Sequence, residues 1–204
     1  MGVVAIVDFG LCNLDSIRRA VEECWKPAVV TASGADIGRA SRVILPGVGA
    51  FREAMMNLRA LGLADVLREQ VVERGIPLLG ICLGMQLMAR IGHEGGRSEG
   101  LGFIEGEVRR LDPRPGERLP HIGWNDVCFD EGSPLFAGIA AGTDFYFVHS
   151  YHLVPEDASA VAARTPYGGG FVSALARPPL FGVQFHPEKS QKPGFQLLRN
   201  FLAF

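Results

Sequence analysis

The chain has 204 residues, which fits a single domain large enough to bury most of its apolar surface in one core. Its formal net charge is -2 at pH 7 and its Arg residues are scattered, so it lacks the basic stripe of a nucleic-acid-binding protein. Its four cysteines show neither CxxC spacing nor histidine partners at zinc-ligand intervals, which predicts neither a disulfide framework nor a metal site. We therefore expect one domain over residues 1–204, with no metal and no cofactor.

The apolar start of the chain, residues 1–9, lacks the basic beginning and the cleavage site of a signal peptide and contains Asp8. We expect it to form the first strand. No apolar stretch is long enough to span a bilayer. These features predict a cytoplasmic protein that binds neither nucleic acid nor membrane.

The first half of the sequence alternates apolar runs with amphipathic stretches. Strands are predicted at residues 3–8, 28–31, 42–45 and 77–81, and helices at residues 14–24, 51–74 and 83–91. Strands that are apolar nearly throughout, separated by helices, are typical of a parallel sheet covered on both faces. The sequence therefore predicts an α/β fold with a mostly parallel central sheet flanked by helices.

The second half has more β-type patterns and more Pro and Gly turns. Strands are predicted at residues 106–111, 126–129, 144–150, 160–165 and 180–185, followed by a closing helix at residues 193–201. We expect these strands to form an antiparallel β extension of the sheet. No repeat, low-complexity segment or linker marks an internal domain boundary.

The segment 80–86, which contains Cys82, directly follows the apolar run at residues 76–79, and Gly80 and Gly84 lie on either side of Cys82. A strand that enters a helix through one nucleophilic residue needs such glycines, because a Cβ would clash there. A helix beginning at Leu83 would direct free N–H groups and its positive dipole end at the sulfur, which favours the thiolate. The pattern predicts a nucleophile, although a lone buried Cys is more often a packing residue.

His186, Pro187 and Glu188 follow a second apolar run about a hundred residues later. An imidazole can take the thiol proton and return it to a leaving group, and a carboxylate can fix the ring tautomer. Pro187 restricts the backbone between the two side chains. Together with Cys82, these residues form a candidate Cys-His-Glu triad.

The segment Pro46-Gly47-Val48-Gly49 follows the predicted strand 42–45. Its glycines allow backbone N–H groups to face an anion without a side chain in the way. One of these N–H groups, with that of Leu83, is a candidate oxyanion hole, and the alternative is an ordinary strand-to-helix turn. No Gly-Lys-Ser/Thr follows the loop and no GxGxxG occurs, which disfavours a nucleotide phosphate site.

Four candidate residues follow predicted strands: Asp8, Pro46, Cys82 and His186. Ligands of open α/β sheets bind beyond the carboxyl ends of the strands, so we expect a single cleft there. A thiolate, a His-Glu pair and an oxyanion site together predict acyl transfer, in which the sulfur attacks an amide or ester and water releases the acid.

The triad motifs and the Pro46–Gly49 loop resemble the class I glutamine amidotransferases, which hydrolyse glutamine and pass ammonia to a synthase. Four further segments are similar to the glutaminase subunits of imidazole glycerol phosphate synthase, from histidine biosynthesis: residues 13–19, 120–125, 147–151 and 189–190. The resemblance spans residues 4–201.

This resemblance implies that Cys82 is the nucleophile, His186 the base and acid, and Glu188 the group that orients the imidazole. Gln86 lies one helical turn beyond Cys82 and therefore faces the same cleft. The residues implied around the glutamine and its oxyanion are Gly47, Val48, Gly49, Leu83, Gln86, Ser150 and Tyr151.

The resemblance also implies a partner, a (β/α)8 cyclase subunit that forms a heterodimer with this chain and receives the ammonia. The residues implied at that interface are Asn13, Trp124, Asn125 and Lys189. From the residues alone, Trp124 is equally consistent with core packing and Lys189 with an exposed surface charge.

Three alternatives remain open from the sequence. A glutaminase of another synthase, such as anthranilate or pyridoxal phosphate synthase, would keep the triad but lack residues 120–125 and 189–190 as they stand here. A Cys hydrolase of esters or peptides fits the bare triad, and Gln86 weighs against it. A catalytically idle docking subunit would have lost a triad member, and none is missing.

Overall fold

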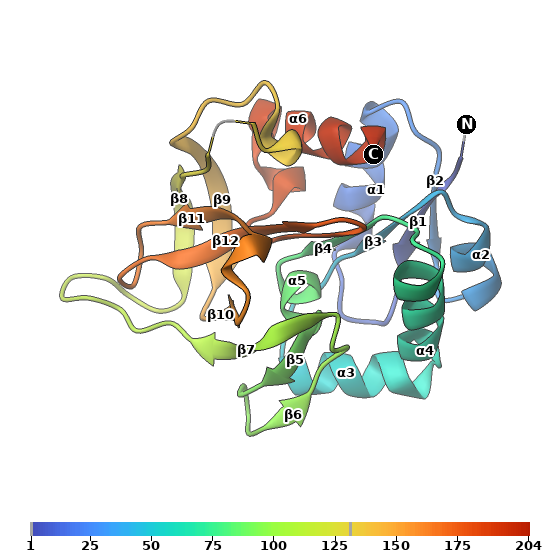
Figure 1. The fold of residues 1–204 in the computed structure, drawn as a ribbon, viewed down its shortest axis with the longest axis horizontal. Helices are drawn as coiled ribbons and strands as arrows, with labels where there is room; N and C mark the ends of the chain where they lie inside the picture. The colour runs from blue at the N-terminus through green and yellow to red at the C-terminus, as the bar shows by residue number, and fades with distance from the viewer. Residues whose placement is uncertain (1, 131) are drawn as a thin grey trace.

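A computed structural model describes residues 2–130 and 132–204 and has a seven-stranded sheet at its centre, with strand order β11-β12-β13-β4-β3-β1-β2 (Figure 1). The five strands from β13 to β2 are parallel, and β12 and β11 continue the sheet in antiparallel fashion. This arrangement confirms the predicted α/β class and its antiparallel extension. In sheet order the strands are β11 (Val161–Thr165), β12 (Phe171–Arg177), β13 (Leu180–Val183), β4 (Leu78–Ile81), β3 (Arg42–Leu45), β1 (Val4–Val7) and β2 (Ala28–Thr31).

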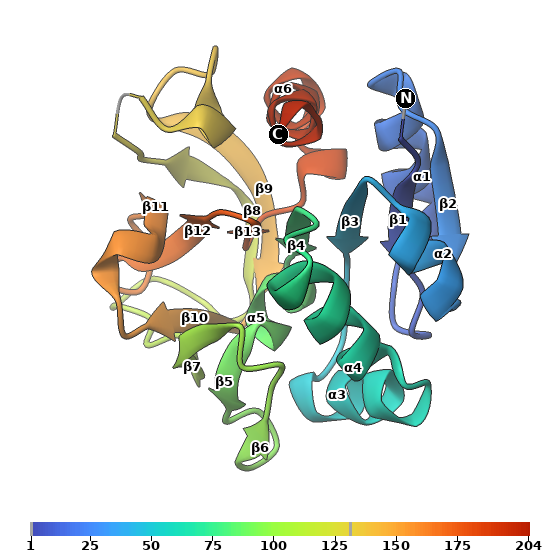
Figure 2. The same cartoon turned by 45° about the vertical axis from the view of Figure 1, so that its right-hand side comes forward.

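Helices cover both faces of the sheet, and each face has its own apolar core (Figure 2). Helices α1 and α6 pack on one face, and α2 to α5 with a π-helical turn on the other. Strands β1, β4 and β13 are buried throughout because both of their faces are covered. The helices are α1 (Leu14–Glu23), α2 (Gly34–Arg39), α3 (Phe51–Ala60), α4 (Leu63–Leu67), the π-helical turn η1 (Arg68–Glu73), α5 (Leu83–Leu87) and α6 (Gln191–Ala203).

The amphipathic pattern of the two long helices explains their placement. Ile17, Ala20 and Val21 of α1 recur at helical spacing and are the buried residues of that helix. Leu197, Leu198 and Phe201 form the equivalent apolar stripe of α6. Both stripes join one core cluster against the central sheet.

Two smaller sheets flank the central one. A four-stranded sheet has the order β10-β7-β5-β6, and β8 pairs with β9 in an antiparallel ribbon. The strands are β5 (Ala89–Gly92), β6 (Ser98–Glu99), β7 (Ile104–Arg110), β8 (His121–Val127), β9 (Thr143–His149) and β10 (Tyr151–Pro155). Short 3-10 turns complete the fold: η2 (Pro134–Phe136), η3 (Ala158–Ala160) and η4 (Pro187–Lys189).

Several predicted bounds were wrong. The helix expected at 51–74 is interrupted at Gly62, which adopts a left-handed conformation with φ of 68°. The helix expected at 83–91 ends at Leu87, because Ala89–Gly92 pairs with β6 and β7 instead. Strands β10 and β12 and helix α2 were not predicted. The strands were missed because strand pairing overrides local periodicity.

Within the described residues, no helix is long and apolar enough to cross a membrane.

Candidate active site

Cys82 lies in the sharp turn between β4 and α5. Its backbone has φ of 53° and ψ of -111°, a conformation that a residue with a side chain rarely adopts. A Cβ on Gly84 would lie 1.7 Å from the Leu45 carbonyl oxygen, and one on Gly80 would lie 2.7 Å from the backbone nitrogen of Met85. Both glycines are therefore required by close backbone contact, as the sequence predicted. The strained turn is held by its neighbours, as is common at functional sites.

His186 and Glu188 follow the adjacent strand β13 and form a buried pair. His186 Nδ1 lies 2.8 Å from Glu188 Oε1, and the two side chains are only 4% and 1% exposed. The bond to the carboxylate fixes Nδ1 as the protonated nitrogen and leaves Nε2 for proton exchange. Among the described residues, His186 Nε2 has no hydrogen-bond partner.

The electrostatic surroundings of His186 favour its protonated form. Burial of the imidazolium lowers its pKa, but the neighbouring Cys82 sulfur and the Glu188 carboxylate outweigh that cost and raise the pKa of His186 to about 10. His186 is consequently an imidazolium at neutral pH. A cationic ring next to a cysteine is the environment in which a thiol reacts as a thiolate.

A cavity of about 250 Å³ opens beside the Cys82 sulfur. It brings together six of the seven residues that the sequence assigned to substrate and oxyanion binding: Val48, Gly49, Leu83, Gln86, Ser150 and Tyr151. Gly47 lies just behind, where its carbonyl oxygen accepts from the Leu83 N–H at 3.3 Å. Segments that are distant in sequence thus meet at the carboxyl ends of β3 and β4.

Asp8 does not share this cavity, contrary to the single cleft expected from the sequence. Its carboxylate accepts from the Gly10 N–H at 3.0 Å, and it lines a separate hollow with Phe9 and Gly10. The reason is sheet order, since β1 is separated from β4 by β3 and so lies about 10 Å away.

Two of the N–H groups considered for an oxyanion hole, those of Val48 and Leu83, are engaged with backbone carbonyls. The Val48 N–H donates to the Leu11 oxygen at 2.8 Å, and the Leu83 N–H donates to the Gly47 oxygen. Gly49 has φ of 103°, which only glycine adopts without strain. In this conformation the loop directs the Val48 N–H toward Leu11.

Gln86 is 4% exposed and held by two hydrogen bonds. Its Nε2 donates to the Tyr151 carbonyl oxygen at 2.8 Å and to Gln184 Oε1 at 3.0 Å. Both amide protons are thereby used. The oxygen Oε1 is left to accept from a ligand in the cavity.

Glu94 also lines the cavity and was missed by the sequence analysis. Its Oε2 accepts from the Phe51 N–H at 2.8 Å, at the first residue of α3. A capping box would have signalled such a residue, but Glu94 lies far from α3 in sequence, so no local signal existed. It places a carboxylate opposite Gln86 and Gly49.

The four residues expected at a partner interface come from the start of α1, from β8 and from η4. Trp124 is 47% exposed on β8, and the Lys189 ammonium lies 5.7 Å from the Tyr146 ring on β9, next to Trp124. Asn125 points to the other side of β8 and lies 3.1 Å from His121 Nε2. Asn13 is exposed at the start of α1.

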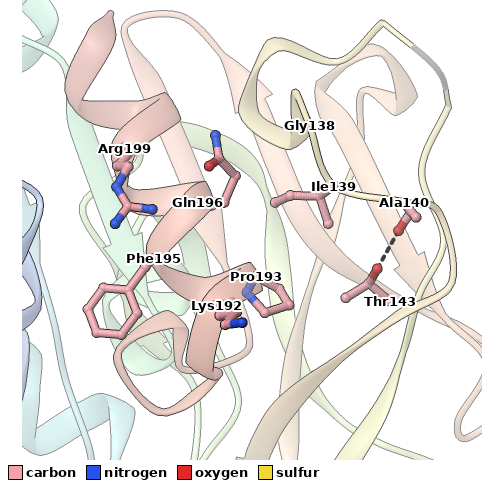
Figure 3. A pocket seen from close by; sticks show the side chains of 9 residues that line it. All are labelled: Gly138, Ile139, Ala140, Thr143, Lys192, Pro193, Phe195, Gln196 and Arg199. Carbon is pink, nitrogen blue, oxygen red and sulfur yellow. Dashed lines mark hydrogen bonds between the residues drawn. The ribbon is translucent and has the colours of Figure 1, made fainter.

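A second cavity, of about 550 Å³, lies between α6 and the segment after η2 (Figure 3). Its described lining includes Lys192, Phe195 and Arg199 but no cysteine, histidine or carboxylate. Cys82 lines the smaller cavity and not this one. Among residues 2–130 and 132–204, no three His, Cys, Asp or Glu side chains are grouped to hold a metal ion.

Comparison with known proteins supports the assignment of the fold and the class. Residues 5–203 match the family model of glutamine amidotransferase class-I. A solved glutamine amidotransferase superposes with a TM-score of 0.78 at 21% identity, covering 99% of this chain and 98% of that one. A putative GMP synthase subunit from Thermoplasma acidophilum has a TM-score of 0.75 at 19% identity, covering 100% and 93%. At these identities the likeness shows a shared fold.

Curated relatives are closer in sequence. The imidazole glycerol phosphate synthase subunit HisH of Moorella thermoacetica is 50% identical over 201 residues, covering 98% of this chain and 94% of the relative. The HisH subunit of Aquifex aeolicus is 45% identical over 197 residues, covering 96% and 94%. The chain therefore belongs to the class I glutamine amidotransferases and, within them, to the HisH subunits of imidazole glycerol phosphate synthase.

Proposed function

We propose that this HisH-type amidotransferase hydrolyses glutamine to glutamate and ammonia, with Cys82, His186 and Glu188 as its catalytic triad. The observation that carries the proposal is the strained turn that holds Cys82 at the mouth of the cavity, beside the buried His186–Glu188 pair. The residues, their burial and their order along two adjacent strands fit a cysteine nucleophile with an oriented acid–base.

The reaction proceeds in two halves. The Cys82 thiolate attacks the carboxamide carbon of glutamine, His186 gives its Nε2 proton to the amide nitrogen, and the carbon–nitrogen bond breaks to release ammonia. Water then attacks the thioester after losing a proton to His186, and glutamate leaves as the thiolate is regenerated. Glu188 holds the ring in the tautomer that both halves need.

The oxyanion of each tetrahedral intermediate needs backbone donors, and Val48 and Leu83 are the candidates. In the described conformation the Val48 N–H is bonded to Leu11, so the loop must turn before this donor can serve. Gly47 and Gly49 on either side of Val48 permit such a turn. We infer that the chain alone is a poor glutaminase and that partner binding favours the turned loop.

The polar groups of glutamine find counterparts in the cavity. Gln86 Oε1 accepts from the substrate, the Ser150–Tyr151 backbone borders the opposite wall, and Glu94 supplies a carboxylate for the α-ammonium group. Burying an ammonium group without an opposite charge would cost free energy, so the α-ammonium group requires a carboxylate beside it.

The partner is a cyclase subunit of (β/α)8 type in a heterodimer. Free ammonia in water at neutral pH is mostly protonated and unreactive as a nucleophile, so it must pass between the subunits through a sheltered route. Trp124 and Lys189, with Asn13 and Asn125, are the residues assigned to that contact. The exposed ring of Trp124 suits the buried centre of an interface.

The experiment is glutamate release from glutamine by the purified chain, measured alone and after adding the cyclase subunit with its ribonucleotide ligand. A large rise on addition is expected. Steady activity without a rise would keep the glutaminase and reject this partner. No glutamate in either case would indicate a different acyl substrate.

A further inference from the structure

The peptide nitrogen of Cys82 donates to the Val183 carbonyl oxygen at 2.8 Å, and this bond sets Gln184 directly beside the nucleophile. Gln184 is fully buried, and its Nε2 lies 3.6 Å from the Cys82 sulfur. Neither the triad nor the substrate contacts proposed above use this side chain. A buried amide that faces a nucleophilic sulfur requires an explanation.

The orientation of the Gln184 amide follows from its neighbours. The Tyr151 carbonyl oxygen can only accept, so the amide group of Gln86 must present Nε2 to it. The second proton of that nitrogen then points at Gln184, so Gln184 must accept this hydrogen bond with its oxygen Oε1. Gln184 Nε2 is thereby left to donate toward the sulfur. If the Gln184 amide were flipped, its oxygen would face the thiolate and its nitrogen would face the Gln86 nitrogen, so that two donors would meet.

A pair of buried histidines secures the Tyr151 carbonyl from the other side. His149 Nδ1 donates to the Tyr151 oxygen at 2.9 Å, which leaves His149 Nε2 as an acceptor for His121 Nδ1 at 3.0 Å. Burial lowers the pKa of His149 to about 3 and that of His121 to about 4, so both rings are neutral. This neutrality lets each ring donate from one nitrogen and accept at the other.

We propose that Gln184 is a positioning residue that donates an N–H to the Cys82 thiolate, with its amide held in that orientation by Gln86, the Tyr151 carbonyl and the neutral His149. The proposal rests on the assignment of Cys82 as the nucleophile. The donated bond stabilises the charged sulfur and aims it at the cavity. The titratable groups around this site, His186 next to the sulfur and His149 and Glu94 in the cavity lining, are unchanged in the Gln184 variants.

The test is the rate at which iodoacetamide alkylates Cys82 in the full chain as a function of pH, read for each cysteine by peptide mass spectrometry. Q184L removes the donor at similar volume. We expect its Cys82 profile to move about one unit to higher pH, with a roughly tenfold lower rate at neutral pH. The exposed Cys128 is an internal reference that should not change.

A matched control is Q70L, which removes another buried glutamine amide, on η1 and away from the cavity. Its Cys82 profile should coincide with that of the wild type. If Q184L and Q70L both keep the wild-type profile, Gln184 only fills space and the proposal is wrong. Since no glutamine is present, this result does not depend on the identity of the substrate, which glutamate release by the wild type tests separately.

A second pair of variants tests the orienting role of His149. In H149N the side-chain nitrogen can take the place of Nδ1 and still donate to Tyr151, whereas H149L cannot. We expect the H149L profile to move in the same direction as that of Q184L, and H149N to restore part of that shift. If the Cys82 profile moved equally far in both variants, the hydrogen bond to the Tyr151 carbonyl would not be what orients the Gln184 amide.

Discussion

Two strand-to-helix turns meet at the candidate active site, and they are built in opposite ways. The Cys82 turn is closely packed, and a single added carbon at Gly84 would collide with the Leu45 carbonyl. The Pro46–Gly49 loop is open on one side, where a Cβ on Gly49 would come no closer than 3.9 Å to Leu11. The nucleophile and the neighbouring Leu83 N–H are therefore fixed by close packing, whereas the loop that carries the Val48 N–H has room to move.

That contrast fits the proposal that a partner activates the enzyme. On the proposed mechanism, Cys82 and the His186–Glu188 pair are already in place in the isolated chain, whereas the Val48 N–H must leave Leu11 before it can stabilise the oxyanion. The free energy of partner binding then needs to change only a short glycine-flanked segment. The four predictions that follow test each side of this comparison.

The largest effect is expected at the fixed turn. C82S should lower glutamate release in the complex by about 10⁴-fold or more, because the hydroxyl is a far weaker nucleophile in a site built for a thiolate. Partner affinity, measured by titration calorimetry, should stay the same. Glutamate release that survives in this variant would show that another group is the nucleophile.

The packing of the turn is tested by G84A. The added Cβ would lie 1.7 Å from backbone, so the strand or the helix must shift, and we expect the free energy of unfolding to fall by about 3 kcal/mol. Urea unfolding measures the loss. A loss below that of G62A, where the only cost is a left-handed backbone in open space, would contradict close packing at this turn.

The loop is tested by G49A. Because φ at Gly49 is 103°, we expect a cost of about 1–2 kcal/mol in unfolding free energy, similar to that of G62A. Only G49A should also reduce the rise in glutaminase activity that the partner brings. If both variants are activated as strongly as the wild type, movement of this loop does not limit catalysis.

Mild acid is expected to destabilise the folded chain. In the folded chain the pKa values of His121 and His149 are about 4 and 3, against 6.5 for a free histidine. Below pH 6.5 the unfolded chain therefore binds protons that the folded chain does not bind. The free energy of unfolding should therefore decline as pH falls from 6.5 toward 4. Urea midpoints at pH 7, 6 and 5 measure the slope.

H121F provides the comparison for that slope. Phenylalanine keeps an aromatic ring in the stack between Phe147 and Tyr167 but binds no proton. Its urea midpoints should fall less steeply between pH 6.5 and pH 5 than those of the wild type. An unchanged slope would mean that His121 is not a neutral buried group in the folded chain.

The candidate triad and the central sheet could both be predicted from the sequence. The Cys82 turn is predicted by Gly80, Gly84 and the apolar run before them. The constraint is local, because it depends only on which side chains fit beside one backbone bend. The amphipathic spacing of α1 and α6 is local in the same sense, and both helices lie within a few residues of their predicted bounds.

The missed strands were decided by pairing partners and not by their own residue pattern. Residues 89–92 have helical periodicity, and 151–155 and 171–177 gave no strand prediction, yet all three segments pair with other strands. Glu94 reaches the cavity because it caps a helix more than forty residues away, and Asp8 leaves it because the strand order inserts β3. Neither position can be predicted from the residues next to Glu94 or Asp8 in the sequence.

Local sequence is enough to predict the chemistry: a cysteine in a glycine-flanked turn, a histidine with a carboxylate two residues later, and apolar strands to carry them. How donors and acceptors are shared around that chemistry depends on the tertiary structure. The backbone bond from Val48 to Leu11 joins the loops after β3 and β1, and the hydrogen bonds that run from His121 to Gln184 join β8, β9, β10, α5 and the residue after β13. Residue types follow from local sterics, but hydrogen-bond direction is settled only when every buried donor has found its acceptor.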